Sequence, residues 1–210
     1  MIEVVTFNDL KTLGDPDGVV VSTVSASKEW GGLSPFLIGP CQMWSNRKSR
    51  NMENAWQYTK VYPCHLEDDG SVGAKWMAWA TSGWYSQRAH RYPMGKGALP
   101  LYSWWNGHRL GYVEARKAIY VPLYQLAVSQ TDAWKRLQDA SNAASDAGRN
   151  LYLLDYDAYR HKGMGMSYLD VANNAVRKMG HAFVLAMMLE DQGALSVLLE
   201  EGKKLRGDIQ

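Results

Sequence analysis

The segment 52–60, MENAWQYTK, carries three polar residues at helical spacing. Glu53, Gln57 and Lys60 are spaced i, i+4 and i+7, so a helix would place them on one face, beside Trp56. The carboxylate could serve as a general base or stabilise positive charge at a sugar C1 carbon. The lysine could neutralise a phosphate, or attack a sugar carbon if burial removed its charge. A solvated Glu/Lys stripe has the same spacing, so spacing alone does not name a reaction.

Five further residues are weighed as ligand-binding or structural. Tyr102, Trp104 and Trp105 precede an Asn-Gly pair in a predicted loop, where aromatic rings stack on a base or fill the core. Arg116 lies in a predicted helix; buried, it would suit a bidentate phosphate contact, and exposed, it would be an ordinary surface charge. His181 lies in an apolar segment, which is more typical of a structural histidine than of a catalytic one.

Composition limits the classes of function. The 210 residues are 46% hydrophobic, enough for one sizeable core, and the net charge of +2 does not indicate nucleic-acid or membrane binding. Nine Trp and 12 Tyr against 3 Phe favour pockets or interfaces as well as core packing. Two cysteines make neither a disulfide framework nor a metal site, and no signal peptide or membrane span is visible. We therefore expect a cytoplasmic protein without metal or cofactor.

Element patterns favour a single domain, residues 1–210, that is mostly α with a few short strands. The first half is expected to hold a strand at 19–21, a loop at 31–40, helices at 51–61 and 75–85, and loops at 63–75 and 91–100. The second half is expected to hold a helix at 110–128 divided by Pro122, a helix at 131–143, a strand at 150–156, a helix at 168–190 and a short last helix. Ser167 and Asp170 form a capping-box pattern, and Gly193 is a predicted helix stop. The Gly-Lys-Gly in loop 91–100 lacks P-loop spacing, which argues against nucleoside triphosphate binding.

Four blocks in order resemble the NADAR family, and a bacterial and phage branch of it in particular. They are LSPF at 33–36, MENAWQYTKV at 52–61, LGYVEARKAIYVPLY at 110–124 and LLDY at 153–156. The resemblance covers residues 30–190, with 191–210 as a C-terminal helix and tail. It implies a NADAR-like domain that binds an ADP-ribose-type nucleotide or an ADP-ribosylated nucleobase and cleaves an N-glycosidic bond.

The resemblance also implies roles for particular residues. Glu53 falls on the family's catalytic acid, Lys60 is expected near the phosphate or the sugar, and Asp155 or Asp157 near the ribose. Arg160, in the loop that follows, joins the ligand-binding candidates. That loop, AYRHKGMG, lacks the tryptophan of the family's D-x-x-W-G-x-G motif. Two alternatives therefore stay open: a non-catalytic module that binds an NAD-derived nucleotide, and a phage or mobile-element factor that acts on modified nucleic acid or counters ADP-ribosylation.

Overall fold

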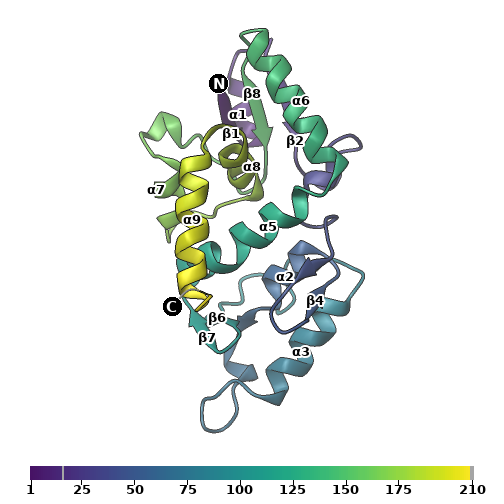
Figure 1. The fold of residues 1–210 in the computed structure, drawn as a ribbon, viewed down its shortest axis with the longest axis vertical. Coiled ribbons are helices and arrows are strands. Elements are labelled where there is room, and N and C mark those ends of the chain that lie inside the picture. The colour runs from purple at the N-terminus through teal and green to yellow at the C-terminus, as the bar shows by residue number, and fades with distance from the viewer. Residues whose placement is uncertain (16, 209–210) are drawn as a thin grey trace.

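A parallel three-stranded sheet forms the upper part of the computed structural model, which describes residues 1–15 and 17–208 (Figure 1). Its order is β1 (Ile2–Val5), β8 (Leu151–Leu154), β2 (Val19–Ser22), with β8 in the middle. All four residues of β8 are buried, as expected of a central parallel strand. The strands predicted at 19–21 and 150–156 are confirmed.

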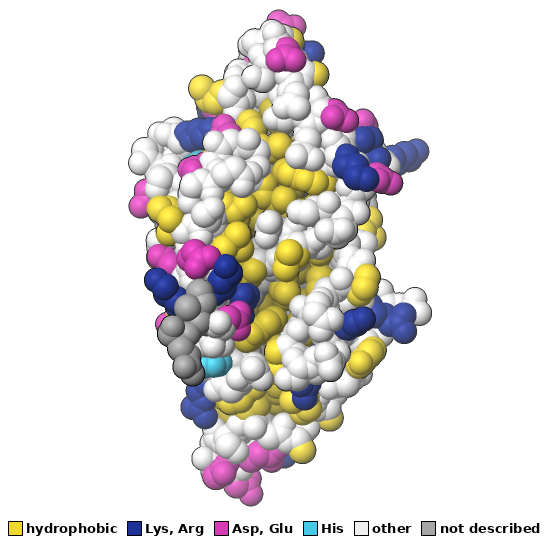
Figure 2. Space-filling view, in the orientation of Figure 1, with side chains coloured by type: hydrophobic (Ala, Val, Ile, Leu, Met, Phe, Trp, Pro, Cys, Tyr) yellow, Lys and Arg dark blue, Asp and Glu magenta, His cyan; other side chains and the backbone are white. Residues whose placement is uncertain are grey.

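Helices cover this sheet and continue below it (Figure 1). They are α1 (Phe7–Thr12), α5 (Val121–Val128), α6 (Asp132–Asp146), α8 (His181–Glu190) and α9 (Gln192–Leu205). Helix α8 is apolar on nearly all sides and packs against β1, β8, α5 and α9, because a helix without a polar face must lie in the core. Figure 2 shows a band of apolar side chains running down the face over α5.

The lower part is built around α2 (Met52–Gln57), α3 (Ala74–Tyr85) and two small antiparallel sheets (Figure 1). One sheet pairs β3 (Cys41–Gln42) with β4 (Lys48–Ser49); the other has the order β5 (Lys60–Val61), β6 (Tyr102–Trp105), β7 (His108–Leu110). Four buried indole rings hold these elements together, with the Trp44 ring 4.8 Å from that of Trp105 and 5.3 Å from that of Trp84. Many of the tryptophans are therefore core residues.

The described residues form a single compact α/β domain, with 46% helix, 13% strand and three small sheets. The prediction of a helix-rich chain with a few short strands holds at this level. Among the described helices, none combines the length and the apolar character needed to cross a bilayer.

Two predicted helices are wrong in extent. Helix α2 ends at Gln57, and Lys60 lies on β5, where it pairs with Ser103 of β6. The predicted helix 168–190 is two helices, α7 (Tyr168–Asn173) and α8, because the Asn174 side chain accepts the amides of the next turn and ends the first helix. The capping box of Ser167 and Asp170 at the start of α7 is confirmed.

Two other predictions need correction. Tyr102, Trp104 and Trp105 lie in strand β6 and not in a loop, because Asn106 and Gly107, both with positive φ, make a two-residue hairpin turn. Gly193 lies inside α9 and does not end a helix, since Asp191 caps the amide of Ala194 and the chain continues helically.

The predicted helix 110–128 has three parts: α4 (Tyr112–Ala115), a π-helical turn (Arg116–Tyr120) and α5. The helix is interrupted near Pro122, as predicted. The interruption is the wide π turn just before Pro122, and the chain stays helical through it. The helices at 75–85 and 131–143 are confirmed as α3 and α6.

Candidate functional site

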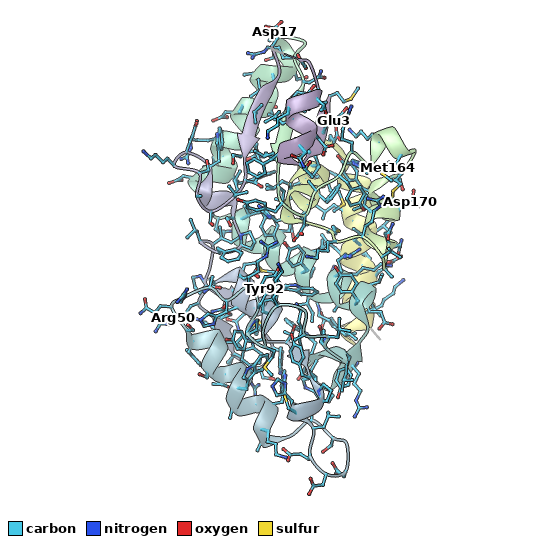
Figure 3. All side chains as sticks on the ribbon, turned by 180° about the vertical axis from the view of Figure 1, so that it is seen from behind. Glu3, Asp17, Arg50, Tyr92, Met164 and Asp170 are labelled. Carbon is cyan, nitrogen blue, oxygen red and sulfur yellow. The ribbon has the colours of Figure 1, made fainter. Side chains whose placement is uncertain are left out.

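A cleft of about 890 Å³ lies between the upper and lower parts of the domain. Figure 3 labels one of its wall residues, Tyr92, at mid-height, below Glu3 and Asp17 of the upper part. Its walls come from the loop 34–36, α2, the loop 91–100, the π turn and the segments 155–157 and 176–181. Segments far apart in the sequence thus meet around one cavity, which is the usual arrangement of a small-molecule site.

The LSPF loop holds the start of α2 against this cleft. The Glu53 amide donates to the carbonyl of Pro35 at 2.8 Å, and the Met52 amide donates to that of Ile38 at 2.9 Å. The Asn51 side chain accepts the amide of Asn54 as the helix N-cap. The first amides of the helix are therefore satisfied by the loop, which fixes Glu53 at the cleft wall.

Glu53, Gln57 and Lys60 form one hydrogen-bonded chain along this wall. The Lys60 ammonium donates to Gln57 Oε1 at 2.6 Å, and Gln57 Nε2 donates to Glu53 Oε1 at 2.9 Å. The Lys60 Nζ also lies 5.1 Å from the centroid of the Trp56 ring. The predicted grouping of these four residues is confirmed, although Lys60 returns to Gln57 from a strand and not from the next helical turn.

Burial favours the neutral form of Glu53 and of Lys60, the two ends of this hydrogen-bonded chain. Glu53 is 5% exposed, and desolvation raises the pKa of its carboxyl against the lowering effects of the Gln57 hydrogen bond and the Lys60 charge. Desolvation lowers the pKa of Lys60 to about 8, although the Glu53 charge acts in the other direction. Since Glu53 Oε1 accepts from Gln57, a proton on this carboxyl would sit on Oε2.

Asp155 is equally buried, but its carboxylate is bound by His181 and by two backbone amides. Its Oδ2 lies 3.1 Å from His181 Nδ1, and the other ring nitrogen of His181 lies 2.9 Å from the carbonyl oxygen of Thr23. The amides of Ala182 and Asp157 also donate to the Asp155 carboxylate. Both ring nitrogens of His181 thus face acceptors, which is the pattern of a doubly protonated imidazolium.

The two partners shift each other's titration. Burial alone would raise the pKa of Asp155, but the charge and hydrogen bond of His181, with the two amides, lower it to about 2. Burial alone would lower the pKa of His181, but the charge and hydrogen bond of Asp155 outweigh it and raise that pKa. His181 is therefore satisfied structurally, and Asp155 joins β8 to the start of α8.

Asp157 lies at the mouth of the cleft between two cations. Its carboxylate is 3.2 Å from an Arg91 guanidinium nitrogen and 3.5 Å from Lys178 Nζ. The Arg91 guanidinium also lies over the rings of Tyr92 and Tyr156. The pair of Asp157 and Arg91 links the segment after β8 to the loop 91–100, across the opening of the cleft.

Arg116 lines the cleft, but backbone carbonyls occupy its guanidinium. One nitrogen donates to the carbonyls of Val171, Ala172 and Asn174, each at 3.0 Å, and the other donates to that of Arg177 at 3.1 Å. The carbonyls of Val171, Ala172 and Asn174 lie at the end of α7, and that of Arg177 follows in the next segment. Arg116 is therefore buried, as the phosphate-binding alternative required. Its guanidinium, however, caps the end of α7 and does not contact an anion.

Four candidate residues lie outside the cleft lining. Trp105 is buried in the aromatic core, the Trp104 ring lies 6.4 Å from that of Trp76, and Tyr102 packs under Arg109. Arg160 forms an ion pair with Glu3 of β1 at 2.9 Å. The structure therefore does not bring these four together with Glu53 and Lys60.

Several wall residues were absent from the sequence-based candidates. They include two lysines and two tyrosines, namely Lys96, Lys178, Tyr92 and Tyr120. The loop 91–100 could have been suspected from its glycines and its lysine, which are typical of a ligand-facing loop. No sequence signal brings Lys178 and Tyr120 to the same cavity, because that proximity depends on the tertiary fold.

In the described part of the chain, no group of three or more His, Cys, Asp or Glu side chains is arranged to hold a metal ion. Comparison with known proteins found no matching family model, no matching curated protein and no matching solved structure.

Proposed function

We propose that this chain hydrolyses an N-glycosidic bond in an ADP-ribose-type or nucleotide-type substrate, such as the bond between ADP-ribose and a nucleobase. The observation that carries the proposal is the buried chain of Glu53, Gln57 and Lys60 on the wall of the cleft. It supplies a carboxyl with a raised pKa and an amine with a lowered one in the same place. Perturbed groups that converge on a cavity are typical of catalytic sites.

The rest of the cleft suits a phosphorylated ligand with a flat ring. Positive side chains outnumber negative ones: Lys60, Arg91, Lys96, Arg116, Lys178 and His181 line it with Glu53, Asp155 and Asp157. This excess of positive charge favours an anionic ligand. Aromatic side chains on both walls, namely Phe36, Trp56, Tyr62, Tyr92, Tyr112 and Tyr156, offer faces for a base.

In the proposed reaction, protonated Glu53 acts as the general acid. Its Oε2 proton passes to the base as the C1–N bond breaks and the bonding electrons stay on the base nitrogen. A water molecule forms the new C1–O bond, and its proton returns to the Glu53 carboxylate. Gln57 keeps the carboxyl oriented, and Lys60 holds a ligand phosphate or, when neutral, contacts the sugar carbon.

The test is incubation of the protein with guanine-ADP-ribosylated DNA and with ribosyl-phosphate nucleotides, followed by detection of the released base. We expect Glu53→Gln to lower the rate by about 10²–10⁴-fold, the usual contribution of one acid–base group. Glu200→Gln is the matched control, because Glu200 is exposed and pairs only with Lys203 on α9. The absence of cleavage by the wild type, or unchanged cleavage by Glu53→Gln, would refute the proposal.

A second candidate is a binding module that holds such a nucleotide without turnover. Asp155 is committed to His181, and Asp157 is paired with Arg91 and Lys178, so neither carboxylate after β8 is free of a partner. Titration calorimetry with ADP-ribose separates the candidates. Binding without any cleavage supports the module, whereas no binding by the folded protein excludes both.

A further inference from the structure

Tyr120 is a buried tyrosine on the wall of the cleft, and its hydroxyl has no hydrogen-bond partner among the described residues. It is 8% exposed, it lines the cavity, and its hydroxyl makes no hydrogen bond with another described residue. Buried polar groups nearly always have a partner. Among the described residues four other side-chain atoms also lack one, namely Asn51 Nδ2, Trp84 Nε1, Tyr102 OH and Tyr159 OH, but none of these four residues lines the cleft. Among the described residues, its ring contacts the Trp56 ring edge-on, with centroids 5.2 Å apart.

Tyr120 and Glu53 line the same cavity. The charges of Asp155, Glu53 and Asp157, all wall residues, act on the Tyr120 phenol. Burial and these carboxylates raise the pKa of Tyr120 well above its usual value, so the group stays neutral and keeps its proton. A neutral phenol beside carboxylates can donate a hydrogen bond, but it cannot supply a negative charge.

The π turn explains why this phenol is held at the wall. Pro122 has no amide hydrogen, so the carbonyl of Ala118, four residues earlier, loses its regular helical partner. The Arg206 guanidinium of α9 donates to that carbonyl at 2.8 Å. Gly202 of α9 allows this close approach, because a Cβ there would lie 2.3 Å from the carbonyl oxygen of Lys117. Helix α9 thus stabilises the wide turn that ends in Tyr120, and such turns are frequent at functional sites.

Tyr124, one turn further on, provides a direct contrast. Its ring stacks on that of Tyr120 at 6.2 Å, yet it is 0% exposed and lies outside the cleft lining. Its hydroxyl donates to the carbonyl of Leu33 in the LSPF loop at 2.6 Å. These two neighbouring buried tyrosines therefore differ in one respect: the Tyr124 hydroxyl has a protein acceptor, whereas Tyr120 lines the cavity and its hydroxyl has no partner among the described residues.

We infer that the Tyr120 hydroxyl donates a hydrogen bond to a sugar oxygen of the ligand and so is a further ligand-contacting residue of this site. The inference rests on the proposed function, since it assumes a sugar beside Glu53. The donor would fix the sugar over the carboxyl through a hydroxyl on the cleft wall for which the described residues offer no hydrogen-bond partner. Its role is positioning and binding, and it transfers no proton.

The experiment compares Tyr120→Phe with Tyr124→Phe, using ADP-ribose as the calorimetric probe and the thermal midpoint as the readout of folding. We expect Tyr120→Phe to bind ADP-ribose about 10-fold more weakly, the usual effect of losing one hydrogen bond, with an unchanged or higher midpoint. Tyr124→Phe should show the reverse: a lower midpoint and ligand affinity within about 2-fold of wild type, because its lost bond lies inside the protein. In turnover assays, Tyr120→Phe should raise KM more than it lowers kcat.

The possible outcomes separate the two proposals. Binding by wild type that Tyr120→Phe leaves unchanged overturns this inference alone. A lower midpoint for Tyr120→Phe, with affinity lost to the same extent in Tyr124→Phe, assigns both hydroxyls to folding and also overturns it. Failure of the folded wild type to bind ADP-ribose or ribose 5-phosphate overturns the inference and the proposed function together.

Discussion

Two carboxyl groups in the same cleft are buried to the same degree, but their pKa values are shifted in opposite directions. Glu53 is 5% exposed and Asp155 is 4% exposed, so desolvation acts on both. Glu53 receives one hydrogen bond from a neutral amide, and its pKa rises; Asp155 receives an imidazolium and two backbone amides, and its pKa falls. The partners, and not burial, decide the direction in which the pKa of each carboxyl moves. Glu53 is suited to acid–base chemistry, and Asp155 is a structural anion.

Removing the Asp155 charge should have the largest effect. Asp155→Asn leaves the His181 imidazolium buried without its counter-ion, so we expect the free energy of unfolding to fall by about 3–5 kcal/mol. Urea denaturation at neutral pH measures this change. Asp157→Asn is the matched control, because its ion pairs are partly exposed and should contribute less than about 1 kcal/mol. Equal, small losses in both variants would contradict the structural role of Asp155.

The same pair gives a pH dependence with a definite sign. The folded-state pKa of Asp155 lies below its ordinary value of 3.8, so its contribution is complete above about pH 4 and is lost as the pH falls toward 2. The folded-state pKa of His181 lies above 6.5, so its contribution is complete below about pH 6.5 and is lost as the pH rises through the folded value. Both slopes should be absent from the stability profile of Asp155→Asn.

The close approach of α8 to Asp155 should give the next largest effect. A Cβ at Gly180 would lie 2.1 Å from Asp155 Oδ2, so Gly180→Ala must push the carboxylate away from the helix. We expect a loss of about 1–3 kcal/mol in the free energy of unfolding. In Gly193→Ala the nearest atom is 3.6 Å away, and alanine in α9 should stabilise the protein by up to about 1 kcal/mol.

A double-mutant cycle assigns the cause. If the clash is with the Asp155 carboxylate, Gly180→Ala should cost clearly less in an Asp155→Ala background than in the wild type. The same cost in both backgrounds would show that Gly180 serves another contact, such as the one with the Asp157 carbonyl.

The sequence could predict one of these two carboxyl environments but not the other. Glu53, Gln57 and Lys60 are close in the chain, so a local turn after α2 is enough to bring them together. Their predicted grouping was therefore correct although the predicted helix was too long. The contact of Asp155 with His181 joins residues 26 positions apart, and it exists only because β8 and α8 pack against each other. The role of Asp155 therefore depends on a long-range partner, whereas the hydrogen-bonded partners of Glu53 are local.

Two errors in the predicted helices and strands differ in how strong a sequence signal they had. The hairpin at Asn106 and Gly107 had a recognisable turn signal, so strand β6 could have been predicted from the residues. The break after α7 had only two adjacent asparagines and Gly180 as a signal. The predicted helix 168–190 ran across this break and included Val176, which is 94% exposed and lines the cleft. Apolar spacing cannot separate a core face from the wall of a cavity.

The smallest expected effect concerns the coupling within the Glu53 chain. The Glu53 charge raises the pKa of Lys60, whose value is about 8, so Glu53→Gln should lower that pKa further, by a fraction of one unit. Reductive ¹³C-methylation followed by an NMR titration of the lysine signals measures the shift. Glu67→Gln is the control, because Glu67 pairs with Lys75 and should leave Lys60 unchanged.

The sign of this shift tests the contrast between the two carboxyls. A lower Lys60 pKa in Glu53→Gln means that Glu53 has given up its proton by the time Lys60 titrates, as a group that exchanges protons must. An unchanged value would mean that Glu53 stays neutral throughout, which would contradict its return to a carboxylate in the proposed reaction. Asp155→Asn should move the Lys60 pKa less than Glu53→Gln does, because Glu53 is the carboxylate whose charge raises that pKa.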